Sequence, residues 1–247
     1  MLLDGLAPIE IAIFYTVAFL IGMSKTGIHG TGMLAVPLLA IVFGGMSSSG
    51  IMLPMLCIAD IFGVSYYHRH ASWKHLRMLF PSAAAGILIG SVAGVYINDE
   101  VFKLIMGIVI LISIVLMLWL ERTRQREVPQ NKFLGSFTGL AGGFTSMIGN
   151  LAGSVMAVYF VLMRLPKNVF IGTTAWFFLV INLFKVPFHI FHWKSISVDT
   201  FLLDLTAIPA IAIGAFCGVA VVRKMSDTGY RWFIIAMTVI AAMVMLF

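Results

Sequence analysis

Ser24-Lys25-Thr26-Gly27-Ile28-His29-Gly30 is a short polar stretch that interrupts a very hydrophobic chain. A second interruption, Thr145-Ser146-Met147-Ile148-Gly149-Asn150, lies at the matching place in the second half. Polar, non-helical backbone at membrane depth is tolerated only where protein or a water-filled cavity satisfies its polar groups. A pair of such glycine-containing breaks in two halves of a membrane protein is the sequence pattern that points to a transporter's substrate site.

The composition excludes a soluble globular domain. Of 247 residues, 61% are hydrophobic and only 11% are charged, which is too little charge to cover a water-exposed surface. Several apolar runs approach the ~18–20 residues that cross a bilayer as a helix, so the chain is predicted to be an all-α polytopic membrane protein in contact with lipid. The net charge of +6 comes from basic residues in short loops, which indicates membrane topology and not nucleic-acid binding. Cys57 and Cys217 lie in apolar runs and give no disulfide or metal pattern, and no cofactor is expected.

The apolar runs divide the chain into two similar halves. The first membrane repeat is expected over residues 1–120, a charged cytoplasmic connector over 121–132, and the second repeat over 133–247. Each repeat would hold two segments too short to span comfortably, as a broken or re-entrant helical hairpin, followed by three transmembrane helices. A pair that spans fully but is tilted and interrupted is the alternative. The short segments are 8–22, 30–43, 133–147 and 151–163, and the spans are 50–67, 76–97, 101–120, 169–190, 200–222 and 230–247.

Loop charge predicts the orientation. The connections around 69–77, 122–132, 164–167 and 223–224 are basic and should share the cytoplasmic side, whereas Asp99 and Glu100 fall outside. Each repeat then crosses the membrane an odd number of times, so the repeats are inverted and both termini lie outside. Small-residue spacings late in each half, Gly90–Gly94 and Gly214–Gly218, favour close helix packing.

Lys25 is the central candidate for binding a ligand. A cation at membrane depth costs at least ~2.5 kcal/mol on insertion scales, so it needs a partner there unless it is a topology charge near a membrane face. Hydroxyls beside it, and free N–H groups if the next helix begins near Gly27–Gly30, would suit an oxyanion. The substrate-binding residues predicted at this first break are Ser24, Lys25, Thr26, Gly27, His29, Gly30 and Thr31.

The second break is neutral and rich in hydrogen-bond donors. Its predicted substrate-binding residues are Thr145, Ser146, Gly149, Asn150, Gly153 and Ser154, and a following span adds Thr173, Thr174, Asn182 and Lys185. Asp60 is the clearest carboxylate inside a span, and it could pair with Lys25 or Lys185 or carry a coupling proton or sodium ion. There are two competing interpretations: the second break serves only helix packing, and Asp60 forms a purely structural ion pair.

The order and spacing of these features resemble the TauE/SafE sulfite exporter family. The resemblance covers essentially the whole chain and rests on Gly22 through Gly30, on Gly142-Gly143 through Gly153, and on Phe170-Ile171-Gly172-Thr173-Thr174 followed by Asn182. It implies a bacterial inner-membrane transporter of sulfur-containing anions such as sulfite and organosulfonates. The first break departs from a plain run of glycines, because it carries Ser24-Lys25-Thr26-Gly27.

Other function classes are weighed against this one. An intramembrane enzyme would need a catalytic motif, and the chain has no GxGD pair, Ser/His dyad or HExxH sequence, so no enzyme is predicted. A cation or metal transporter would need several oxygen ligands, whereas only Asp60 lies clearly mid-span. Within the transporter class, export of the anion is favoured, and a proton- or sodium-coupled sulfonate importer is the alternative.

Overall fold

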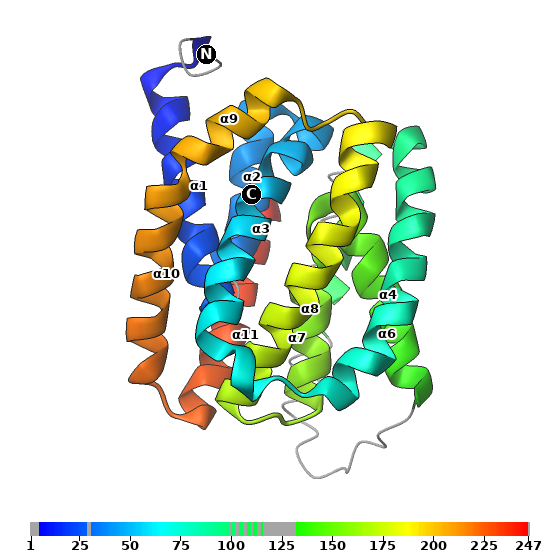
Figure 1. Ribbon diagram of the computed structural model, residues 1–247, viewed down its shortest axis with the longest axis vertical. Helices are drawn as coiled ribbons and strands as arrows, with labels where there is room; N and C mark the ends of the chain where they lie inside the picture. The colour runs from blue at the N-terminus through cyan, green and yellow to red at the C-terminus, as the bar shows by residue number, and fades with distance from the viewer. Residues whose placement is uncertain are drawn as a thin grey trace.

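The computed structural model describes residues 5–28, 31–98 and 132–246, with scattered positions between 100 and 115. Within these residues every regular element is helical, and the helices lie side by side in a bundle (Figure 1). In chain order they are α1 (Pro8–Lys25), α2 (Thr31–Phe43), α3 (Gly45–Tyr67), η2 (His68–His70), α4 (Trp73–Ala93), η3 (Gly94–Tyr96), α6 (Lys132–Gly149), α7 (Ala152–Leu162), α8 (Lys167–Pro187), the π-helix η4 (Phe188–His192), α9 (Val198–Thr206), α10 (Ile208–Arg223) and α11 (Asp227–Leu246).

Four helical stretches of the described chain are long and apolar enough to cross a membrane. They are Pro8–Lys25, Ser47–His70, Trp73–Tyr96 and Lys167–His192. A multi-pass membrane protein is therefore confirmed, and so are the predicted spans 50–67, 76–97 and 169–190. Of the span predicted over 101–120 only scattered positions are described, and the connector over 121–132 lies outside the described residues except for Lys132.

The span predicted over 200–222 is not one straight helix. It is broken at Ala207 into α9 and α10, which meet at 48°. Pro209 lies two residues further on, and a proline has no backbone N–H to donate and its ring clashes with the preceding turn of a continuous helix. Counted together, this bent pair would be a fifth span.

Both polar breaks are shorter than predicted. α1 continues through Ser24 and Lys25 and ends before Gly27, whose φ of 132° is one that side chains rarely adopt. α1 is therefore also long enough to span, which corrects the short segment predicted over 8–22. α6 continues through Thr145 and Ser146 to Gly149, and the chain turns at Asn150 with φ 56°. The polar residues at 145–146 thus belong to a helix and not to a loop.

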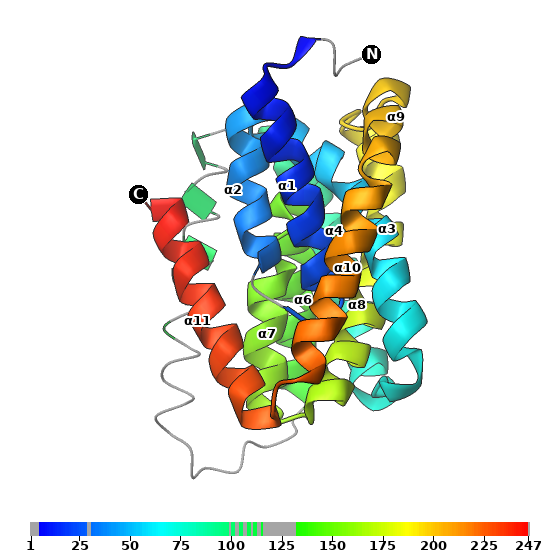
Figure 2. The ribbon, with the colours of Figure 1, turned by 90° about the vertical axis from the view of Figure 1, so that its left-hand side faces the viewer.

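The two helical hairpins enter the bundle from opposite ends. α1 runs inward from the end that holds the N-terminus, and α2 returns toward that end (Figures 1 and 2). α6 runs inward from the other end, and α7 returns to it. The breaks between α1 and α2 and between α6 and α7 therefore both lie inside the molecule. α11 ends in the half of the bundle that also holds the N-terminus.

Helix packing is reciprocal between the halves. α1 of the first half packs on α10 of the second, and α6 of the second half packs on α4 of the first. Both contacts depend on glycines: a Cβ on Gly22 would lie 2.1 Å from the Ile211 carbonyl oxygen, and one on Gly143 would lie 2.0 Å from that of Ala83. The backbones touch there, as at small-residue interfaces in lipid.

The basic loops gather at one end of the bundle, the lower end in Figure 1. The Lys167 ammonium donates to the carbonyls of Val222 and Met225, and the Arg223 guanidinium lies 5.7 Å from the centre of the Tyr66 ring. The loops before α4, before α8 and before α11 thus share one side, as loop charge predicts.

Candidate functional site

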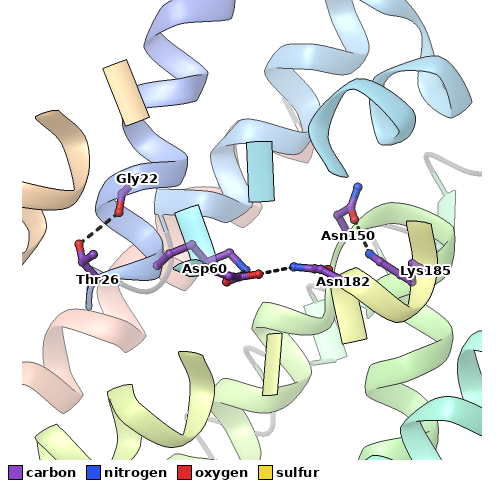
Figure 3. Close-up of polar contacts among 7 residues, drawn as sticks. Gly22, Thr26, Asp60, Asn150, Asn182 and Lys185 are labelled. Atoms are coloured by element: carbon purple, nitrogen blue, oxygen red, sulfur yellow. Dashed lines mark hydrogen bonds and ion pairs between the residues drawn. The ribbon is translucent and has the colours of Figure 1, made fainter. Parts of the chain in front are cut away.

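Lys25 and Asp60 form a buried ion pair between the first hairpin and α3. The Lys25 ammonium lies 2.9 Å from Asp60 Oδ1, and the Asn182 amide donates to Asp60 Oδ2 at 2.6 Å (Figure 3). Asp60 is fully buried and Lys25 is 8% exposed. Pairing and hydrogen bonding offset the cost of taking both charges out of water.

The Lys25 ammonium keeps capacity for a further acceptor. Its close ion pair with Asp60 Oδ1 engages one N–H donor of the ammonium. The ammonium also sits 3.9 Å from the centre of the Phe178 ring, a cation–π contact that fixes its position. An ammonium has three N–H donors, so an anion could be bound without breaking the ion pair.

Lys185 is a second buried cation, held by neutral oxygens. Its ammonium donates to Asn150 Oδ1 at 2.6 Å and to the Ser146 carbonyl at 2.9 Å (Figure 3). The Asn150 amide group in turn donates to the carbonyl and the hydroxyl of Ser49. Lys185 is 0% exposed, and no carboxylate of the described residues pairs with it. With both lysines protonated, the site carries two positive charges against the single negative charge of Asp60.

A small cavity joins the two breaks. It offers about 40 Å³ to the centres of water-sized molecules, room for a few waters at ~10–15 Å³ each or for one small ion. The lining combines polar residues with three apolar side chains, those of Met52, Leu56 and Phe178, which together are called its apolar wall. The lining residues are Ser24, Lys25, Gly32, Met52, Leu56, Ser146, Asn150, Gly153, Phe178 and Asn182.

Two helices begin at this cavity. Gly32 is the second residue of α2 and Gly153 is the second residue of α7, and both line it. The first N–H groups of a helix have no partner within the helix, and its dipole is positive at that end. Both features favour an anion in the cavity.

The structure brings together about half of the residues predicted from the sequence. Ser24, Lys25, Ser146, Asn150, Gly153 and Asn182 line the cavity, and Lys185 and Asp60 contact lining residues. Gly27 and Gly149 lie at helix ends away from the lining, and His29 and Gly30 lie outside the described residues.

The predicted hydroxyls mostly serve their own helices. Thr31 bonds to Leu20 and Ile28, whereas the others donate to carbonyls three or four residues back: Thr26, Thr145, Ser154, Thr173 and Thr174. Thr26 also donates to the Ala215 carbonyl at 2.9 Å and so faces α10, away from Asp60 (Figure 3). Thr173 also accepts from the Ser72 backbone, in the basic loop before α4.

Five residues of the site were not predicted from the sequence. They are Ser49, Gly32 and the apolar wall of Met52, Leu56 and Phe178. Gly32 lies only two residues beyond the first break, so its place in the sequence is the signal that could have identified it. The wall residues look like ordinary span residues, and only tertiary packing distinguishes them.

Comparison with known families gives one match. A family model described as "Sulfite exporter TauE/SafE" matches residues 14–245, nearly the whole chain. Comparisons with curated proteins and with solved structures give no match.

Proposed function

Because the chain belongs to the TauE/SafE sulfite exporter family, we propose that it is a secondary transporter that exports small sulfur-containing anions, sulfite or organosulfonates, across a bacterial inner membrane. The observation that carries this proposal is that two buried lysines, Lys25 and Lys185, lie at the cavity with a single buried carboxylate, Asp60. A site for cations would need the opposite balance.

In this proposal the anion binds between the two hairpins. Lys25 supplies the main charge, Asn150 and Ser24 supply neutral polar groups, and the first turns of α2 and α7 supply backbone N–H groups at Gly32 and Gly153. The apolar wall of Met52, Leu56 and Phe178 would accept the carbon part of an organosulfonate. The size of the cavity limits the ligand to a small anion in this conformation.

The architecture proposed for transport is a pair of inverted repeats. It is supported by the reciprocal packing of α1 on α10 and α6 on α4, and by hairpins that enter from opposite ends. In transporters of this type, one repeat rocks against the other around a site near the midplane. The end that carries the basic loops would face the cytoplasm, with both termini on the other side.

Energetics favour export. An inside-negative potential drives an anion outward by about 2.3 kcal/mol per charge per 100 mV, so a monoanion can leave without a coupling ion. Uptake against the same potential would require a co-transported cation or an outward-moving counter-anion. Asp60, the carboxylate at the site, is the candidate carrier in that alternative.

A ligand screen tests the function. Purified protein is heated with sulfite, sulfate, thiosulfate, taurine or an aromatic sulfonate, and the best stabiliser is then followed by counterflow in proteoliposomes. We expect at least one of these anions to raise the unfolding temperature and to exchange chemically unchanged. Stabilisation by divalent cations alone, or chemical conversion of the anion, would contradict the proposal.

Cysteine labelling tests the orientation. In a variant whose native Cys57 and Cys217 are alanine, single cysteines replace the exposed residues Lys224 and His192, which lie at opposite ends of the bundle. A membrane-impermeant thiol reagent added outside spheroplasts should label position 192 and not position 224. The reverse pattern would show that the basic end faces outward.

A further inference from the structure

Asp204 is a buried carboxyl group that lies apart from the site described above. It is in α9, is 0% exposed, and neither side-chain oxygen has a hydrogen-bond partner among the described residues. Its neighbours along the helix, Leu203 and Ala207, belong to a hydrophobic core with residues of α1 and α3. Burial of a carboxylate without a partner is among the most costly arrangements in a protein.

The two helices that pack closely on α9 are α3 and α10, and neither supplies a charge that pairs with Asp204. On α3 the only charged residue is Asp60, which is held by Lys25 and Asn182. On α10 the only charged residue is Arg223, at the far end of that helix. The remaining titratable groups of these two helices are the thiols of Cys57 and Cys217 and the phenols of α3, Tyr66 and Tyr67.

α1 approaches α9 through a neutral contact. The Tyr15 hydroxyl donates to Thr206 Oγ1 at 3.1 Å, two residues beyond Asp204. Of the charged residues of α1, Glu10 accepts a hydrogen bond from Ala7 at the start of that helix and Lys25 is at its opposite end. A neutral, protonated carboxyl group is therefore the form of Asp204 that fits this environment.

We propose that Asp204 is a proton-binding site that couples movement of the bent α9–α10 pair to the anion site. This inference rests on the proposed transport function. In the conformation described, Asp204 holds a proton because it is sealed from water; when the bend moves and exposes it, the proton is released. Asp60 differs from Asp204 because its buried carboxylate is paired with Lys25 and accepts a hydrogen bond from Asn182.

The fold connects Asp204 to Lys25 through rigid contacts. The Asp204 carbonyl accepts from the Ala207 amide at 3.0 Å, directly at the 48° bend. Beyond the bend, the backbones of α10 and α1 are in direct contact, because a Cβ on Gly214 would lie 2.1 Å from the Phe19 carbonyl oxygen. The Ala215 carbonyl accepts from Thr26, the residue that follows Lys25. A shift of α10 would therefore move the end of α1 that carries Lys25.

The first test measures flux. Wild type, Asp204→Asn and Asp199→Asn are reconstituted in proteoliposomes with sulfite as the probe, and the membrane potential is clamped while a pH gradient is imposed. Asparagine mimics the protonated acid, and Asp199 is an exposed acid of the same helix that serves as the matched control. Because sulfite itself takes up a proton near neutral pH, the gradient should change sulfite flux to some extent in all three proteins. We expect the change to be equal in wild type and Asp199→Asn and clearly smaller in Asp204→Asn, while counterflow persists.

The second test detects the proton directly and does not depend on transport. Infrared spectra of the purified protein at neutral pH should show the carbonyl stretch of a protonated carboxyl group in wild type and in Asp60→Asn, and its loss in Asp204→Asn. An unchanged pH response in Asp204→Asn, or a wild-type spectrum without that band, overturns the proposal. Absence of sulfite flux from wild type with the band present would count against sulfite as a substrate and leave the proton site standing.

Discussion

Replacing Lys25 with methionine should weaken binding of the sulfur-containing anion by about tenfold or more. Methionine keeps the bulk of the side chain and removes its charge, and a hydrogen bond to a charged group contributes about 1.5–3 kcal/mol. The ammonium lines the cavity, so its loss acts directly on the ligand. Titration calorimetry with the anion selected in the stability screen measures the change.

The single variant also has a cost in stability, which has to be separated from its effect on binding. Without Lys25, the Asp60 carboxylate is left buried with only the Asn182 amide, and breaking a buried ion pair in this way costs about 3–5 kcal/mol. The double variant Lys25→Met/Asp60→Asn removes both charges. We expect it to recover most of the lost unfolding temperature and none of the lost affinity.

Two further variants complete the test. Asp60→Asn alone leaves the positive charge of Lys25 without its counter-ion, so anion affinity should be equal to or higher than that of wild type. Lys224→Met replaces an exposed lysine at the basic end of the bundle, and it should change neither the unfolding temperature nor the anion affinity. Anion binding of wild-type strength in the folded double variant would show that Lys25 is not the anion's main partner.

The sequence predicted the helical segments well because hydrophobic runs and helix breakers are local signals. Spans 50–67 and 76–97 correspond to α3 and α4 because apolar length alone identifies a span. The bend at Ala207 was not predicted, although Pro209 was visible, because proline near the end of an apolar run is also compatible with a kinked continuous span.

The site was predicted only in part because sequence does not fix how each helix is rotated. Lys25 and Thr26 are adjacent, yet one lines the cavity and the other faces α10, where Gly218 leaves room for its hydroxyl. Asp204 was missed for a related reason. It lies near the beginning of the span predicted over 200–222, a position where a carboxylate commonly reaches water, and only the packing of α9 buries it.

The close approach of α4 and α6 leaves no room for a side chain at Gly143. A Cβ at this residue would lie 2.0 Å from the Ala83 carbonyl oxygen and 2.7 Å from its carbon, and backbone atoms cannot swing aside as a side chain can. Gly143→Ala must therefore push the helices apart. Overpacking of this kind costs typically ~1–3 kcal/mol and occasionally more.

The neighbouring glycine provides the matched control. A Cβ on Gly142 would meet the flexible Met156 side chain, with its sulfur 3.0 Å away, and the Phe177 ring at an ordinary contact distance of 3.9 Å. Both substitutions gain the same helix propensity, about 1 kcal/mol for alanine over glycine in a soluble helix, so their difference isolates the packing contact. We expect Gly143→Ala to unfold at a clearly lower temperature in detergent than Gly142→Ala.

Gly143→Ala should reduce transport as well as stability, because α6 ends at the second break. Ser146 and Asn150, which hold Lys185 and line the cavity, follow Gly143 within two turns of the helix. Displacing α6 from α4 would move both away from Lys185, so counterflow should be lost in Gly143→Ala and kept in Gly142→Ala. Equal stability and equal flux in the two variants would mean that the α4–α6 contact does not position the site.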